Sequence, residues 1–166
     1  AASGALLREA HLRNLEDIPS SGMAGTLDIG DRNCIHPAKK QQVGTRLAWL
    51  ALSKTYGMKG INADTPVYEK IEVADGKAYL TFRAGREGRA PLGDKLAGFE
   101  VAGADRVFHP ATAWIEKGKG RLIVTSDAVA APVAVRYAFT NVPEASLFNG
   151  SGIPASSFRT DDWEVK

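Results

Sequence analysis

The sequence DIGDRNCIHPAKKQQVG, residues 28–44, decides how the rest of the chain is organised. It reads as the end of a strand, a polar loop with one histidine, His36, and then a proline, Pro37, that opens a helix. The loops that leave the strands of an α/β sheet commonly carry catalytic groups. The stretch therefore predicts that His36 is presented at the edge of an α/β layer.

The composition is typical of a soluble globular protein, since 44% of the 166 residues are hydrophobic and 24% are charged. The net charge of +2 is small and the basic residues are scattered, which argues against a nucleic-acid partner. The apolar run LAWLAL, residues 47–52, is too short to span a bilayer, so we expect no membrane segment. Residues 2–12 lack a basic start and a long apolar run, so we expect no signal peptide there. The single cysteine, Cys34, excludes an internal disulfide.

The first third of the chain predicts a helix, a strand and a second helix. Residues 4–16 are rich in helix formers, and the breakers Pro19 and Gly22 follow them. Residues 23–28 are a short, mostly apolar segment, which is typical of a buried strand. In residues 38–56 apolar side chains recur at the spacing of one buried helical face. These are Val43, Leu47, Leu50 and Ala51. This unit is the tail of an α/β layer and is too small to form a sheet of its own.

From about residue 60 the pattern changes to short β-like runs separated by turn residues. Asp75-Gly76 lies between two such runs and strongly predicts a β-hairpin, because both turn residues adopt positive φ. The Pro-, Ser- and Gly-rich tail from Asn141 keeps large apolar side chains, so we expect it to pack on the protein. Strands are predicted over residues 67–74, 77–82, 99–102, 111–116, 121–125 and 134–139. The predicted chain is mainly β, with an α/β lead-in over residues 1–58 and an antiparallel β-sandwich domain over residues 59–166.

His36 is the strongest candidate for catalysis. A neutral imidazole takes a proton from a hydroxyl group and returns it to a leaving group. That role needs an acid to orient the ring, and Asp31 and Asp28 are both close in sequence. A histidine before a proline can equally cap a helix or face solvent, and the spacing alone leaves both interpretations open.

No nucleophile for this histidine is recognisable. There is no Gly-x-Ser-x-Gly motif, and Ser151, between two glycines, follows no predicted strand. Cys34 lies in the same loop, but catalytic Cys–His pairs are normally distant in sequence. GREG, residues 85–88, lacks the Lys-Ser/Thr of a phosphate-binding loop. His11 and His109 are far apart without metal-ligand spacing, so we expect no metal and no cofactor.

Aromatic side chains are spread over both parts of the chain. Some of them would suit a platform on which sugars stack, although aromatic residues more often belong to a core or an interface. The residues concerned are Trp49, Trp114, Trp163, Tyr68, Tyr79 and Tyr137.

Three blocks of the sequence resemble the sialate O-acetylesterase family of SGNH-type esterases. They are DIGDRNCIHPAKKQQVGTRLAWLALSKTYG (residues 28–57), GFEVAGADRVFHPATAWI (98–115) and PVAVRYAFTNVPEASLFNGSGIPASSFRTDDW (132–163). The resemblance extends over essentially the whole chain, but it concerns only the C-terminal part of those proteins.

This resemblance implies an esterase that removes O-acetyl groups from sugars such as sialic acid. In the family a serine attacks the ester carbonyl, a histidine is the base, and hydrogen-bond donors hold the oxyanion. His36 matches the catalytic histidine. SGNH enzymes usually have an aspartate three residues earlier, where this sequence has Asn33, so Asp31 is our candidate for the orienting acid. A dyad, or an acid from another segment, stays open. The family's serine lies upstream in a Gly-Gln-Ser-Asn type motif that this sequence lacks, and family members are often extracellular or periplasmic.

Two functional hypotheses are therefore compared. In the first, the chain is the C-terminal part of a carbohydrate O-acetylesterase and supplies His36 to a site completed by a missing N-terminal part or a second chain. An O-acetylated sugar is then the substrate, and the chain alone is inactive. The alternative is a β-sandwich interaction or carbohydrate-binding module without catalysis.

Two further expectations complete this interpretation. A complete small hydrolase would need a serine facing the histidine, for which Ser20, Ser21 and Ser151 are the candidates. If the N-terminal part is absent, the second predicted helix exposes an apolar stripe and the lone strand an unpaired edge. We then expect self-association or a partner that covers these surfaces.

Overall fold

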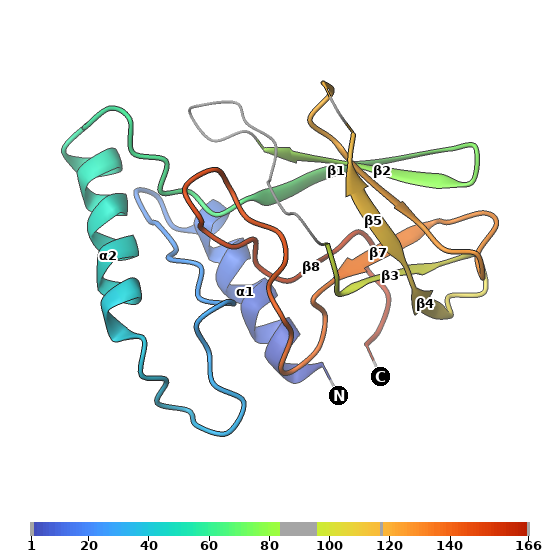
Figure 1. Cartoon of the computed structure of the whole chain (residues 1–166), viewed down its shortest axis with the longest axis horizontal. Helices are drawn as coiled ribbons and strands as arrows, with labels where there is room; N and C mark the ends of the chain where they lie inside the picture. Colours follow the sequence, from blue (N-terminus) through green and yellow to red (C-terminus); the bar gives the residue numbers. More distant parts are fainter. Residues whose placement is uncertain (1, 84–95, 117, 166) are drawn as a thin grey trace.

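Helices occupy the beginning of the chain and strands the remainder in the computed structural model, which describes residues 2–83, 96–116 and 118–165 (Figure 1). The helices are α1 (Ser3–Asp17), α2 (Lys40–Leu50) and the π-helical turn η1 (Ala51–Thr55), which continues α2. The strands are β1 (Val67–Ala74), β2 (Lys77–Arg83), β3 (Phe99–Ala102), β4 (Phe108–Pro110), β5 (Thr112–Ile115), β6 (Leu122–Thr125), β7 (Ala134–Tyr137) and β8 (Phe158–Arg159). No helix in the described part of the chain is long and apolar enough to cross a membrane. GREG, residues 85–88, lies outside the described residues.

The strands form two antiparallel sheets of four strands, in the orders β1-β2-β6-β5 and β4-β3-β7-β8. The hairpin between β1 and β2 turns at Asp75 and Gly76, whose φ angles are 50° and 70°, as the Asp-Gly signal predicted. The mainly β fold class is therefore confirmed, and the six predicted strands all form close to their expected bounds.

One hydrophobic core receives side chains from both sheets. It includes Leu80 from β2, Val124 from β6 and Val101 from β3, all fully buried. The tail supplies Leu147, also fully buried, so the expectation that the tail packs on the protein is confirmed. Tyr137 of β7 fixes the tail as well, because its buried hydroxyl accepts hydrogen bonds from the backbone N–H groups of residues 146 and 147 at 2.9 and 3.0 Å.

The lead-in differs from its prediction in three respects. Residues 23–28 form no strand, because no neighbouring strand is present within the described residues to pair with them; they run as loop and turn. The second helix begins at Lys40 rather than at Pro37, since the Lys40 N–H donates to the carbonyl of Ala38 at 2.8 Å in a tight non-helical turn. The stripe expected to be buried is buried only in part: Leu50 is 7% exposed, as predicted, whereas Leu47 is 52% exposed and Ala51 is exposed as well.

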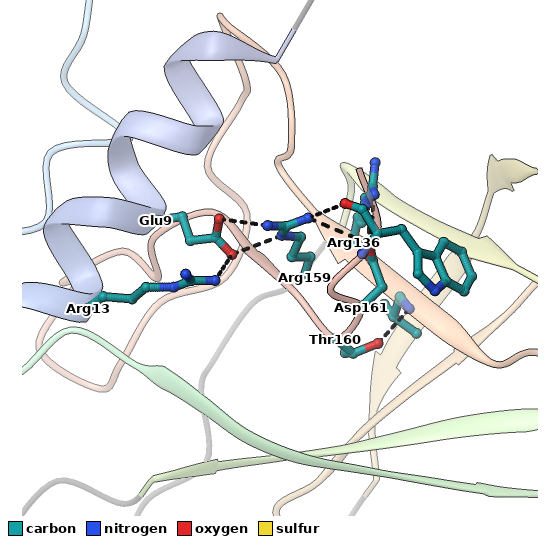
Figure 2. A network of polar contacts seen from close by, with 8 residues as sticks. Glu9, Arg13, Arg136, Arg159, Thr160 and Asp161 are labelled. Carbon is teal, nitrogen blue, oxygen red and sulfur yellow. Dashed lines mark hydrogen bonds and ion pairs between the residues drawn. The ribbon is translucent and has the colours of Figure 1, made fainter. Parts of the chain in front are cut away.

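Charged side chains attach α1 to the second sheet. Figure 2 shows Glu9 of α1 accepting hydrogen bonds from Arg159 of β8 at 2.9 and 3.2 Å. Arg136 of β7 donates to Asp161 at 2.7 and 3.0 Å, and Arg159 lies 3.8 Å from the same carboxylate. The hydrogen bond that Arg159 donates to the Glu9 carboxylate is the main cause of the raised pKa of Arg159. The predicted lead-in and β part therefore share a polar interface, and the boundary at residues 58/59 stays a prediction.

Candidate functional site

The loop that carries His36 is held at its start by one buried arginine of the helix that follows it. Arg46 of α2 donates two parallel hydrogen bonds, each 2.7 Å long, to the carboxylate of Asp28, the residue that begins the loop. Arg46 is only 7% exposed and also donates to the carbonyl of Gly25 at 2.6 Å and to that of Gly152 in the tail at 3.4 Å. A bidentate pair of this kind fixes orientation as well as distance. It therefore holds the start of the loop, the helix that follows it and the tail in one arrangement.

His36 itself lies exposed in this loop. No hydrogen bond joins its imidazole to any of the described residues, whereas its backbone N–H contacts the Cys34 Sγ at 3.4 Å. The Cys34 thiol in turn contacts the backbone carbonyl of His36 at 3.5 Å. Cys34 is thus engaged with the backbone, and the imidazole is left available to a group that approaches from outside the loop.

Asp31 is also exposed and turns back on its own loop. One carboxylate oxygen accepts the backbone N–H of Asn33 at 2.8 Å. Asp31 lines a pocket of about 430 Å³ between α1 and residues 23–32, where Arg8 and His11 of α1 also lie, whereas His36 does not line it. Burial lowers the pKa of Arg8 at this pocket. Within the described residues no hydrogen bond joins Asp31 to His36, so their pairing stays a prediction.

None of the candidate serines is hydrogen-bonded to His36 in the part of the chain that the structure describes. Ser20 is exposed, and the Ser21 hydroxyl is buried without a partner among the described residues. Ser151 lies exposed in the turn before Gly152. The described residues also contain no group of three or more His, Cys, Asp or Glu side chains placed to hold a metal ion.

Most of the aromatic residues have structural partners. Tyr137 is fully buried, and Tyr68 stacks on Phe158 with ring centroids 5.4 Å apart. Guanidinium groups cover two of the others, since Arg121 lies over Tyr79 and Arg106 over Trp163. Trp114 is 39% exposed on β5, and Trp49 lines a pocket on α2.

Arg46 is the structural residue that sequence reasoning missed. Its position on the second predicted helix falls largely off the apolar stripe, so helical periodicity gave no reason to expect a buried side chain there. The signal that was available is the aspartate at the end of the preceding segment, because a buried arginine requires a carboxylate partner.

Comparisons of the sequence and of the structure with known proteins both find acetylesterases, and both matches cover most of this chain. No family model matches the sequence. The chain is 29% identical over 153 residues to the sialate O-acetylesterases of Pongo abelii and Mus musculus, and the match covers 85% of this chain. It spans only 29% and 28% of the lengths of those two relatives. The structure is also similar to that of a carbohydrate acetylesterase from Xanthomonas citri, with a TM-score of 0.86 and 44% identity over 96% of this chain and 36% of that one. The resemblance expected from the sequence is confirmed: the chain is a relative of the sialate O-acetylesterases and carbohydrate acetylesterases, matching one part of them.

Proposed function

We propose that this chain is the C-terminal part of a carbohydrate O-acetylesterase and provides the general base, His36, to a serine-hydrolase site. The nucleophile is on another part of the same protein or on a second chain. The observation that carries the proposal is an exposed imidazole on a loop held at its start by Arg46 and Asp28, without a serine partner among the described residues. A candidate base on a loop that is held at its start, with no nucleophile bonded to it, is what half of a composite active site looks like.

The chemistry assigned to His36 has two proton transfers in each half-reaction. The imidazole takes the proton of the serine hydroxyl as its oxygen attacks the acetyl carbonyl, and then returns that proton to the sugar oxygen as the ester bond breaks. In the second half-reaction it takes a proton from the water that attacks the acetyl-serine, and it returns that proton to the serine oxygen as the acyl bond breaks and acetate leaves. An exposed and otherwise unbonded imidazole suits this exchange, because no described protein contact has to be broken before each transfer.

The exposed side of α2 supports the presence of a further part of the enzyme. Val43, Leu47 and Ala51 recur every four residues, and Leu47 is 52% exposed. A side chain at Gly44, on the same side, would meet nothing within 4 Å. Ile35, next to His36, is 90% exposed. Apolar side chains exposed on α2 and next to a candidate catalytic residue suit a packing interface, and we assign them to contact with the part that carries the nucleophile.

Hydrolysis of a chromogenic acetate ester tests the function. We expect this chain alone to give no more activity than its His36→Ala variant, and a longer protein that contains the upstream part of the relatives to be active. Activity of the chain alone that disappears with His36→Ala would show that a nucleophile is present within these residues. An inactive but folded longer protein, tested also on O-acetylated sugars, would exclude the esterase assignment.

Leu47→Asp is expected to reduce self-association of the isolated chain. Leu47 is half-exposed, so the aspartate costs the monomer little, whereas it places a charge in the surface that is proposed to pack against a partner. Sedimentation velocity over a range of concentrations measures the effect. The control is Val73→Asp on β1, a residue of similar exposure (48%) outside this surface. A wild-type chain that stays monomeric throughout would contradict the assignment of this surface as an interface.

A further inference from the structure

A second surface of α2 has a different chemical character. A pocket of about 330 Å³ lies between this helix and the turn at Ser151. Gln41, Thr45 and Trp49, spaced four residues apart, line it from one side of the helix, and Gln42 lines it as well. The pocket is therefore bounded by one indole, two amides and two hydroxyl groups.

This combination suits a sugar ring, which has both an apolar face and polar hydroxyl groups. The C–H groups on one face of a pyranose pack against a flat apolar surface such as an indole, while its hydroxyl groups need both donors and acceptors. Amide and hydroxyl side chains each supply both. Among the described residues, no hydrogen bond engages the side chains of Gln41, Gln42, Thr45 or Ser151, so their polar atoms are available to a ligand.

The charge of the pocket indicates which sugars it suits. Its one charged lining residue is Arg46, and that guanidinium is 7% exposed and already bound by Asp28 and Gly25. No described lining residue therefore offers a free cation to the carboxylate of an acidic sugar. A neutral sugar avoids the cost of desolvating an unpaired charge at this surface.

The position of the pocket on α2 keeps it open in the complete enzyme that we propose. Trp49 and Leu47 are two residues apart, which at roughly 100° per residue places them on nearly opposite sides of the helix. A partner that covers Leu47 therefore leaves the side of Trp49 accessible. The pocket also begins close to the candidate base in the chain, since Gln41 follows His36 by five residues.

We propose that this pocket is an accessory subsite for a neutral sugar residue, separate from the residue that carries the acetyl ester. The inference rests on the proposed function in one respect, because it takes the sugar to belong to the glycan that the esterase acts on. Binding is nevertheless measured without catalysis, so failure of the subsite leaves the esterase proposal intact, and an inactive esterase leaves the binding result intact.

An NMR titration of the whole chain tests the subsite. The ligands are methyl β-D-galactopyranoside as the neutral sugar and the methyl glycoside of N-acetylneuraminic acid as the acidic one. We expect millimolar binding of the neutral sugar, with shifts of the Trp49 indole N–H and of the Gln41 and Gln42 side-chain amides. The acidic sugar should bind more weakly. Absence of these shifts, or equal or tighter binding of the acidic sugar at the same signals, would overturn the proposal.

Two variants locate the site. Trp49→Ala is expected to weaken binding of the neutral sugar by about tenfold or more, since the stacking surface is lost. The matched control is Trp114→Ala on β5, which removes a part-exposed tryptophan outside the pocket and should leave binding unchanged. Should Trp49→Ala unfold, the double variant Gln41→Ala/Gln42→Ala decides, because both residues are exposed and their loss removes only polar contacts. Unchanged affinity in that variant, or a loss in Trp114→Ala equal to that in Trp49→Ala, would contradict the assignment.

Discussion

Replacing Arg46 by alanine is expected to lower the free energy of unfolding by about 3 kcal/mol, towards the lower end of the ~3–5 kcal/mol typical of a broken buried ion pair. The side chain of Arg46 is 8% exposed and that of Asp28 is 21% exposed, so the remaining carboxylate regains only part of its hydration. The carbonyl of Gly25 also loses its donor, which adds to the cost. The loss is large because one guanidinium joins three segments of the chain.

Urea unfolding followed by tryptophan fluorescence measures this change. The matched control is Arg83→Ala, which breaks the pair between Arg83 and Glu16, where both side chains are more than half exposed. That variant should cost about 0–1 kcal/mol, as surface pairs do. If the two arginine variants lost equal stability, the buried pair would contribute no more to stability than an exposed one.

The second large effect concerns the proposed base. In the longer, active protein His36→Ala is expected to lower kcat/KM for an acetate ester by about 10²–10⁴-fold, the usual contribution of a general base. Stability should change little, because His36 is exposed and no described residue hydrogen-bonds to its imidazole. Steady-state kinetics and a thermal melt on the same preparations separate the two effects. A decrease in activity that follows a decrease in melting temperature would indicate a structural role instead.

Two further substitutions make this result specific. His109→Ala, on β4, removes a histidine from the β part and should retain full activity. Asp31→Asn should lower kcat by a smaller factor than His36→Ala if Asp31 orients the ring in the complete enzyme. Unchanged kcat in Asp31→Asn would assign the acid to another segment, which the asparagine at position 33 already makes a real alternative.

The sequence predicted the β part well because its signals are local. Asp75-Gly76 defines the hairpin through the φ angles of two adjacent residues, and the alternating runs on either side need no distant information. The short strands β4 and β8 were missed, since two or three residues carry no period and pair only because a neighbouring strand is present. Residues 23–28 were wrongly predicted as a strand. Their apolar run has the pattern of a strand, but no described strand lies beside it to pair with.

The candidate site was less predictable because its parts interact over long sequence distances. The burial of Arg46 depends on Asp28, which is 18 residues away, and on a carbonyl of the tail 106 residues away. Helical periodicity cannot predict either contact. It also placed Leu47 on a buried helical face, whereas the described residues leave that side chain half-exposed. The role proposed for His36 depends on groups outside the described residues that would approach its exposed imidazole. The sequence pattern therefore offered only its residue type and its place in the loop.

The contacts of Arg46 and of Glu9 have a consequence for how this segment is inherited. A recombination break between residues 58 and 59 would separate Arg46 from the carbonyl of Gly152 and Glu9 from Arg159. Each fragment would then contain polar side chains without the hydrogen-bond partners that the other fragment had supplied. We therefore expect recombination between related genes to transfer residues 1–58 and 59–166 together, as a single heritable block, rather than either part alone.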